Sequence, residues 1–357
     1  MTARALRVLT TKGSDDVSAN PYVSILARHN AELMDVREFS WRQAFFGDHD
    51  VVHLHWPEAI VRSRSGLKQF GKTALLRLLV AVDRLRGRAH VSTIHNIETH
   101  EQGSAFERAT LRAWLGSCQT RIYLTRAGLQ GAGDDRGVVI PHGDYAEFVT
   151  RYRPDAAREQ SEASVGRVLL FGMLRRYKGV ERLIEEFGRI DPALGLELVI
   201  AGKAIDADYE RQLGELAAAT PAVTVHADRF LSHSELIETV MHSELVILPY
   251  ERMYNSGAAL MALTLQRPVA ATGSPSLLEL ADEFGAGWVQ ALPAELTAEA
   301  IVAAVTALRT HDRGAAPDWT AREWPAIAAA HRDAYRTAVA DARAGRRSSQ
   351  HPPSPRP

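Results

Sequence analysis

The chain has 357 residues, of which 46% are hydrophobic and 24% charged, a composition typical of folded globular domains. Its 42 Lys and Arg nearly balance 43 Asp and Glu, so no overall charge predicts nucleic acid as a partner. The single cysteine, Cys118, excludes an internal disulfide, and no apolar run has the length of a secretory core or a membrane span. We therefore expect a cytoplasmic protein of two domains.

Short β-branched segments alternate with longer helical patterns through the first 150 residues. This alternation predicts a parallel sheet with crossover helices, and thus an α/β domain of the Rossmann-like, doubly wound type. The expected strands are Leu6 to Thr10, Asp50 to Trp56, His90 to Asn96, Arg121 to Thr125 and Gly137 to Gly143.

The pattern lapses over residues 151–166, a polar stretch that we interpret as a linker, and restarts in a second doubly wound domain over 167–318. A helix is expected over 319–344, returning to the first domain, and the Arg-, Ser- and Pro-rich residues 345–357 are expected to be disordered. The strands expected in the second domain are Arg167 to Gly172, Leu196 to Gly202, Val223 to Asp228, Leu245 to Tyr250 and Pro268 to Gly273.

A basic turn follows the first strand of the second domain. In FGMLRRYKG the strand ends at Gly172, a helix begins near Gly179, and Arg175, Arg176 and Lys178 lie between them. Ligands of doubly wound domains bind at the carboxyl ends of the strands, where cations and helix amino-termini favour phosphate. The turn therefore indicates a phosphate site, although a solvated basic loop would have the same sequence.

A second candidate anion site follows the strand Leu245 to Tyr250. Asn255, Ser256 and Gly257 precede a helix of small and apolar residues, so the first amide N–H groups of that helix are accessible and Ser256 can cap it. An ordinary cap before a buried helix is the alternative. Two such elements on neighbouring strand ends together predict a diphosphate site.

With these motifs the sequence resembles the retaining family 4 glycosyltransferases and related bacterial mannosyltransferases of exopolysaccharide synthesis. The resemblance extends over nearly the whole chain and rests on Gly172, Arg175, Lys178 and Gly179, then on Gly257 and the Pro268-Val269 strand. It implies the GT-B fold, with two Rossmann-like domains facing across a cleft, and a nucleotide-diphosphate sugar as donor. The donor-binding residues that follow are Gly172, Arg175, Lys178, Glu251, Asn255, Ser256 and Gly257.

One departure from the family pattern concerns two glutamates that contact the donor sugar and the ribose. The corresponding positions here are Met253 and Met261, and Glu251 is the carboxylate nearest to the first of them. The resemblance therefore leaves the donor and the retaining or inverting outcome open.

Histidines and carboxylates gather at the expected strand ends of the first domain, in HLHWPE, HNIETHE and IPHGDY. Sugar transfer uses a general base near the acceptor hydroxyl, which imidazole or carboxylate can supply. We expect catalysis by Glu101, His95 or Glu58, in that order, and acceptor contacts from His55, His100 and His142. His53, deeper on its strand, is expected in the core, and the histidine spacing does not fit a helical zinc motif.

The segment Ser63 to His90 mixes Leu, Val and Phe with seven Lys and Arg side chains. A basic amphipathic helix of this kind can lie on an anionic membrane, which would make the protein peripheral at the inner face. The alternative is a helix that packs on its own sheet with a basic outer side.

The sequence thus predicts a metal-independent glycosyltransferase without a cofactor, a hexosyltransferase or mannosyltransferase acting on a glycan, glycolipid or small-molecule acceptor. Two alternatives stay open: a sugar-nucleotide epimerase of the same fold, and a non-catalytic subunit that binds nucleotide sugars.

Overall fold

The computed structural model describes residues 4–13, 16–17, 20–63, 65–95, 103–156, 164–251, 256–311 and 316–350, with side chains to residue 346. The chain forms two compact units. The first consists of Met1–Ser14, Pro21–Gly143 and Arg322–Pro357, and the second of Asp15–Asn20 and Asp144–Ala321. No helix of the described residues has both the length and the apolar character needed to cross a bilayer.

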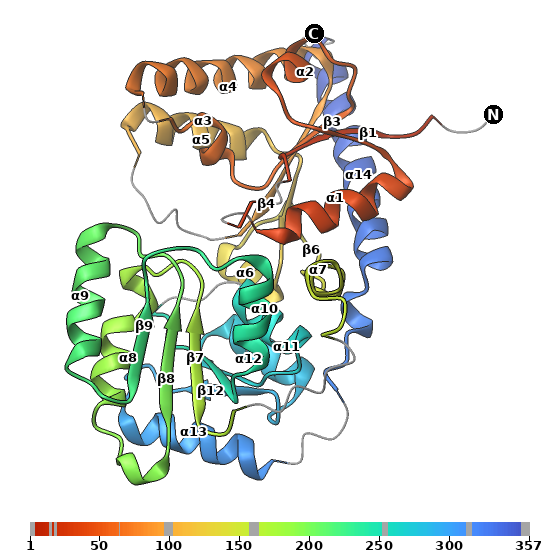
Figure 1. Cartoon of the computed structure of the whole chain (residues 1–357). Helices are drawn as coiled ribbons and strands as arrows, with labels where there is room; N and C mark the ends of the chain where they lie inside the picture. The colour runs from red at the N-terminus through yellow and green to blue at the C-terminus, as the bar shows by residue number, and fades with distance from the viewer. Residues whose placement is uncertain are drawn as a thin grey trace. The chain divides into compact units, whose positions relative to one another are not determined.

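The first unit is a parallel sheet of order β2-β1-β3-β4-β5-β6 with helices on its faces (Figure 1). Its strands are β1 (Arg7–Thr10), β2 (Asp35–Glu38), β3 (Val51–Leu54), β4 (Ala89–Ile94), β5 (Thr120–Tyr123) and β6 (Gly137–Val139). Its helices are α1 (Pro21–Leu33), α2 (Trp41–Phe46), α3 (Pro57–Val61), α4 (Gly66–Arg86), α5 (Ala105–Ser117), α6 (Arg126–Ala132) and α14 (Trp324–Gln350).

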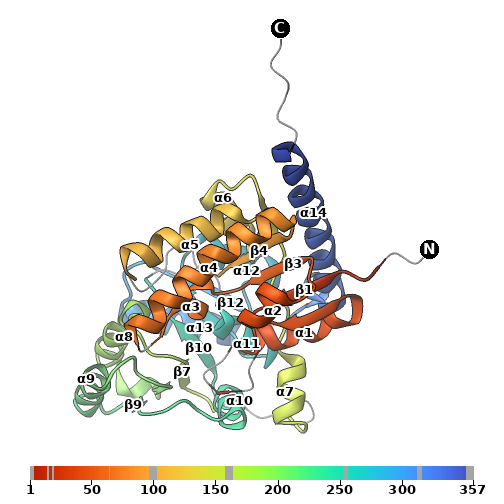
Figure 2. The ribbon, with the colours of Figure 1, turned by 90° about the horizontal axis from the view of Figure 1, so that it is seen from above.

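Alternation along β3 assigns the two faces of this sheet. Val52 and Leu54 belong to the apolar core that includes residues of α4 and α5, two helices that lie side by side in Figure 2. His53 points to the opposite face, where its Nδ1 lies 2.7 Å from Tyr335 Oη of α14. Helix α14 also packs along α1, so the last helix completes a face of the first sheet (Figure 1, blue).

The second unit is also a parallel sheet, of order β12-β11-β10-β7-β8-β9. Its strands are β7 (Arg167–Phe171), β8 (Glu197–Ala201), β9 (Val223–His226), β10 (Leu245–Leu248), β11 (Val269–Thr272) and β12 (Val289–Leu292). Its helices are α7 (Ala146–Tyr152), α8 (Val180–Phe187), α9 (Ala207–Ala218), α10 (His233–Met241), α11 (Gly257–Thr264), α12 (Pro275–Phe284) and α13 (Ala298–Thr310), and short 3-10 turns lie at Arg176–Lys178, Pro192–Leu194 and Thr320–Arg322.

The ten expected strands are all present, and two edge strands, β2 and β12, join them. Helix α14 continues to Gln350, past the point where a disordered tail was expected. A helix that is already formed and packed extends by one hydrogen bond per added residue, which favours continuation through Arg343 to Gln350. The division between the units falls between Gly143 and Asp144, so α7 belongs to the second unit.

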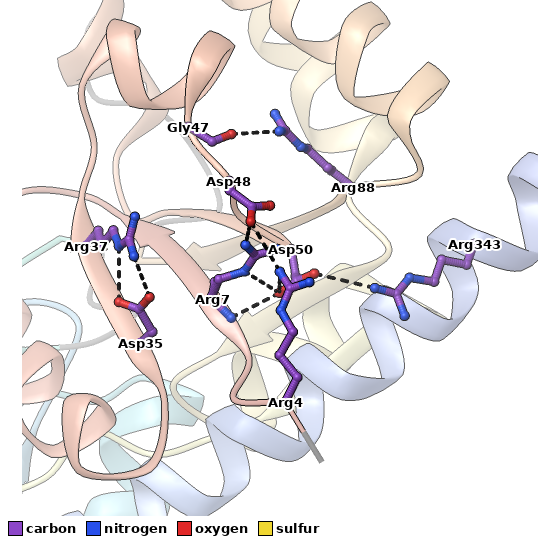
Figure 3. Close-up of polar contacts among 9 residues, drawn as sticks. All are labelled: Arg4, Arg7, Asp35, Arg37, Gly47, Asp48, Asp50, Arg88 and Arg343. Carbon is purple, nitrogen blue, oxygen red and sulfur yellow. Dashed lines mark hydrogen bonds and ion pairs between the residues drawn. The ribbon is translucent and has the colours of Figure 1, made fainter. Parts of the chain in front are cut away.

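Arginine–aspartate pairs lie at the amino-terminal ends of β1 and β3 in the first sheet (Figure 3). Arg7 pairs with both Asp48 and Asp50, and the backbone N–H of Arg7 also donates to Asp50 at 3.2 Å. Arg343 of α14 reaches the second oxygen of Asp50 at 3.4 Å. These contacts tie the far end of α14 to the sheet, on the edge opposite to the carboxyl ends of the strands.

A buried carboxylate, Asp83, joins α4 to β4. It lies 3.2 Å from His90 Nε2 and 3.3 Å from Arg88 Nη1, with no exposed surface. Burial raises the pKa of Asp83, but its contacts with His49 and His90 outweigh this and lower the pKa to about 2. Because the folded pKa is below the unfolded value of 3.8, the carboxylate contributes about 2 kcal/mol at neutral pH, and this is lost as pH falls from about 4 to 2.

We expect Asp83→Asn to lower the free energy of unfolding at pH 7 by about 3 kcal/mol, because it leaves buried basic groups without their counter-charge. Urea denaturation at pH 7 and at several values between 5 and 2.5 measures this. The wild type should lose stability over the acid range, and the variant should lose less. Asp135→Asn, an exposed change, is the control; equal stability of both variants would contradict the assignment.

Candidate functional sites in the two units

Each sheet contains one point where the strand order reverses, and ligands of doubly wound sheets bind outside the carboxyl ends of the strands at that point. In the second unit the order reverses between β7 and β10, and in the first between β1 and β3. The motif residues Gly172 to Gly179 follow β7, and Tyr250 to Gly257 follow β10. His55 and Trp56 follow β3. The sequence motifs therefore lie at the positions where the topology predicts ligand sites.

The turn after β7 is shaped by glycine. Gly179 has a φ of 65°, and a Cβ there would lie 2.6 Å from the carbonyl oxygen of Pro249 after β10. A side chain would thus be strained and would collide with the neighbouring loop. The backbone N–H of Glu251 donates to the carbonyl of Tyr177 at 3.0 Å, so the two loops are joined directly.

Lys178 is turned into this junction. Its side chain is buried, and its Nζ lies 4.9 Å from the ring centroid of Tyr250 and 3.7 Å from where a Cβ on Gly172 would lie. Among the described residues no carboxylate pairs with it. Burial, and to a smaller extent the charge of Arg175, lower the pKa of Lys178 to about 8. A desolvated cation beside a glycine is suited to receive phosphate oxygens.

The two arginines of the turn have different surroundings. Arg175 is half-buried beside Lys178, and its Nε lies 3.1 Å from Met173 Sδ. Arg176 instead faces outward, 4.6 Å from the ring of Tyr209, and contacts Glu181 and Gln212. Arg176 is therefore occupied in holding α8 to α9, which leaves Arg175 and Lys178 as the cations of the site.

The start of α11 has the expected cap, with Ser256 Oγ accepting from the N–H of Ala259 at 3.3 Å. A Cβ on Gly257 would lie 2.9 Å from Tyr145 Oη, so glycine allows this hydroxyl to approach the helix start. Tyr145 was not among the expected site residues, because only the fold brings it to α11. Asn255, another candidate donor contact, lies outside the described residues, and Glu251 is exposed just before that gap.

In the first unit, His55 and His95 form a pair at the ends of β3 and β4. His55 Nδ1 lies 3.2 Å from His95 Nε2, so one imidazole donates to the other. The ring of Trp56 stacks on His95 with 4.1 Å between the centroids, and the ring of Tyr22 lies nearly perpendicular to His95 with 5.7 Å between the centroids. The contact residues Trp56 and Tyr22 could not be identified from residue type, because aromatic side chains are also common in cores.

Two other histidines of this unit, His142 and His53, are also buried. His142 is buried, its Nδ1 is 2.7 Å from the Gly143 carbonyl, and its ring lies 4.2 Å from Tyr22. Burial lowers the pKa of His95 and of His142 to about 3, and that of His55 well below its usual range. His53 makes hydrogen-bond contacts through both ring nitrogens, which agrees with its expected place in the core. These imidazoles are neutral at pH 7.

The carboxylates considered for catalysis are described only in part. Glu58 lies in the first turn of α3, where a negative charge is favoured by the helix amino-terminus. His100 and Glu101 fall within residues 96–102, outside the described ones. Within the ranges that the structure describes, no three His, Cys, Asp or Glu side chains are grouped to hold a metal ion.

Comparison with known proteins shows the family to which the chain belongs. The family described as "Glycosyl transferases group 1" matches residues 166–311, the part that contains the cationic turn and the α11 cap. Along 336 residues the chain is 35% identical to a protein of Xanthomonas campestris pv. campestris named "GDP-mannose:glycolipid 4-beta-D-mannosyltransferase". The match covers 94% of this chain and 92% of that relative.

Solved structures share the fold at lower identity. An Anabaena protein, Alr3699/HepE, determined with UDP and glucose, is similar with a TM-score of 0.58 and 14% identity, over 95% of this chain and 99% of that one. AviGT4, a glycosyltransferase involved in avilamycin A biosynthesis, gives 0.57 and 18% identity over 94% and 98%. These similarities give the fold, which is GT-B.

We expect Lys178→Ala to weaken binding of a nucleoside diphosphate about 10- to 100-fold, the effect of losing one charged hydrogen bond. Wild-type affinity should fall above pH 8 by up to about tenfold per pH unit, because the ammonium of Lys178 then loses its proton. Calorimetry with GDP from pH 6 to 9.5 measures both effects. Arg211→Ala, on the exposed side of α9, is the control, and an unchanged affinity in Lys178→Ala would remove Lys178 from the site.

Proposed function

Because the chain belongs to the group 1 glycosyltransferases and is thus an enzyme that uses a nucleotide sugar, we propose that it transfers mannose from GDP-mannose to a glycolipid. The observation that carries this is the 35% identity along 94% of the chain to a relative named for that reaction. The epimerase and the non-catalytic subunit receive no support from these similarities.

In this proposal the second unit binds the donor through its diphosphate. As the bond from the anomeric carbon to the β-phosphate oxygen breaks, negative charge develops on the leaving GDP. Lys178 and Arg175 stabilise that charge together with the N–H groups at the start of α11, beside Ser256 and Gly257. Fixed cations can serve here without a metal ion, which is why we propose a metal-independent reaction.

We further propose that the reaction inverts the anomeric configuration. GDP-mannose is an α-linked donor, and the relative is named for forming a β linkage, so a single displacement with inversion connects the two. The missing glutamates fit this, since Met253 and Met261 stand where retaining family 4 enzymes are expected to have carboxylates. An inverting displacement requires a base that takes the proton of the acceptor hydroxyl while its oxygen bonds to the anomeric carbon.

The neutral imidazoles of the first unit affect the choice of that base. A group with a pKa near 3 accepts a proton poorly, so His95 is better suited to hydrogen-bond the acceptor than to hold its proton. A carboxylate is the better proton acceptor, which favours Glu101, with Glu58 as the second candidate. His55 fixes the ring of His95 through the contact of 3.2 Å between their nitrogens.

Turnover tests the function directly. We expect the purified protein to transfer mannose from GDP-mannose to a lipid-linked oligosaccharide, to prefer GDP-mannose over UDP- and ADP-sugars, and to remain active in excess EDTA. The product should show a β-mannosyl linkage by NMR of its anomeric carbon–proton coupling. An α-linked product would contradict inversion, and complete, magnesium-reversible loss in EDTA would contradict metal independence.

Removing the base should affect chemistry rather than donor binding. We expect Glu101→Gln to lower kcat about 100-fold or more, with smaller losses for His95→Ala and Glu58→Gln. The affinity for GDP-mannose should change less than about twofold in each variant. Steady-state kinetics and calorimetry separate the two quantities. Turnover near the wild-type value in all three variants would place the base elsewhere.

We also propose that α4 holds the enzyme at the inner, cytoplasmic face of a membrane that contains the acceptor. Leu67, Phe70, Leu78 and Leu85 are more than half exposed on this helix, spaced along one stripe. Exposed basic residues flank the stripe, namely Lys68, Arg77, Arg84 and Arg86. Apolar side chains beside cations match an interface of acyl chains and anionic headgroups better than they match water.

Vesicle sedimentation tests this surface. We expect binding to vesicles containing phosphatidylglycerol and little binding to pure phosphatidylcholine, with about 1 kcal/mol per basic residue near the surface. Leu67→Ser/Phe70→Ser and Lys68→Glu/Arg77→Glu should each reduce binding. The single substitutions Leu278→Ser and Arg211→Glu make the same kinds of change on exposed residues of the second unit, and these variants should bind as the wild type does. Equal binding by all variants would exclude α4.

A further inference from the structure

The resting partner of Lys178 is an aromatic ring where a carboxylate would be usual. A buried ammonium is ordinarily paired with an acid, because removal of its charge from water is unfavourable. Here Nζ lies 4.9 Å from the ring centroid of Tyr250, at the end of β10. Tyr250 is itself buried and packs edge-on against Tyr177 at 6.3 Å, so its ring is held in place from within the same turn.

We propose that Tyr250 is a positioning residue for the donor: its ring face holds the ammonium of Lys178 at the place where the diphosphate binds. The proposal rests on the proposed function, since it names the group that prepares the cation of the donor site. A ring face attracts a cation without neutralising it. A carboxylate in the same place would compete with the diphosphate, which would then have to displace it.

The ring and the hydroxyl of Tyr250 have different surroundings. Tyr250 Oη is buried and has no hydrogen-bond partner among the described residues. It therefore contributes little to the unliganded structure, and its removal leaves no other described group unpaired. The ring alone is in contact with Lys178, so phenylalanine should replace tyrosine here and an aliphatic residue should not.

The space around the ammonium agrees with this role. Gly172 lies beside Nζ and presents only backbone, and its φ of 99° is disfavoured for residues with side chains. The charge of Arg175 also acts on Lys178 and lowers its pKa. The ammonium of Lys178 thus lies between the bare backbone of Gly172 and the ring of Tyr250, and the ring is the group that holds it there.

Calorimetric titration of GDP into six proteins tests the proposal: the wild type, Tyr250→Phe, Tyr250→Leu, Tyr250→Met, Lys178→Ala and Tyr250→Leu/Lys178→Ala. Tyr250→Phe should bind within about twofold of the wild type, and the Leu and Met variants about tenfold more weakly. In the Lys178→Ala background, Tyr250→Leu should have almost no further effect, since the coupling is between these two groups. Melting temperatures show which variants are folded. If Tyr250→Leu is unstable, Tyr250→Met provides a second test of a residue without an aromatic ring.

The outcomes distinguish this proposal from the function on which it rests. Weak binding by Tyr250→Phe would show that the hydroxyl is the contact and would overturn the role of the ring. Equal losses from Tyr250→Leu with and without Lys178 would show a merely structural residue. If Lys178→Ala itself binds GDP normally, Lys178 is not a donor contact and the inference about Tyr250 fails, while the turnover assay still decides the proposed function. If it binds weakly while Tyr250→Leu and Tyr250→Met bind normally, only the inference about Tyr250 fails.

Discussion

The left-handed backbone conformation of Gly179 determines where the basic side chains of the turn after β7 lie. Only glycine takes a φ of 65° freely, and only glycine leaves room for the Pro249 carbonyl 2.6 Å from a Cβ position. This turn directs Lys178 inward over Tyr250 and leaves Arg176 outside with Glu181 and Tyr209. Arg176 and Lys178 are only two positions apart, yet Arg176 holds two helices together, whereas Lys178 is the cation that we propose for the diphosphate.

The two units have the same type of sheet, but the side chains at the reversal of strand order are cationic in the second unit and neutral in the first. At the reversal of strand order the second unit presents cations, which suit a leaving group that gains negative charge. The first unit presents imidazoles whose pKa values are lowered by burial, with aromatic rings packed around His95. Neutral polar groups suit a hydroxyl-bearing acceptor, which must be oriented rather than neutralised.

Much of this architecture could be predicted because hydrophobic runs identify central strands. The strands β2 and β12 could not, since both lie at sheet edges and their residues, such as Arg37 and Gln290, alternate too weakly to stand out. The cationic turn could be predicted because its residues follow one another closely in the sequence. Its partner Tyr250 was not, because a tyrosine at a strand end indicates packing until the fold brings a cation to it.

The pairing of His53 with Tyr335 has a consequence for the order in which the chain is made. The two residues are 282 positions apart, and the first unit is built from both the beginning and the end of the chain. Until α14 has left the ribosome, one face of the first sheet is uncovered and His53 lacks this buried partner. The second unit, nearly continuous from Asp144 to Ala321, can therefore finish folding first, although the first unit is the one whose synthesis begins earlier.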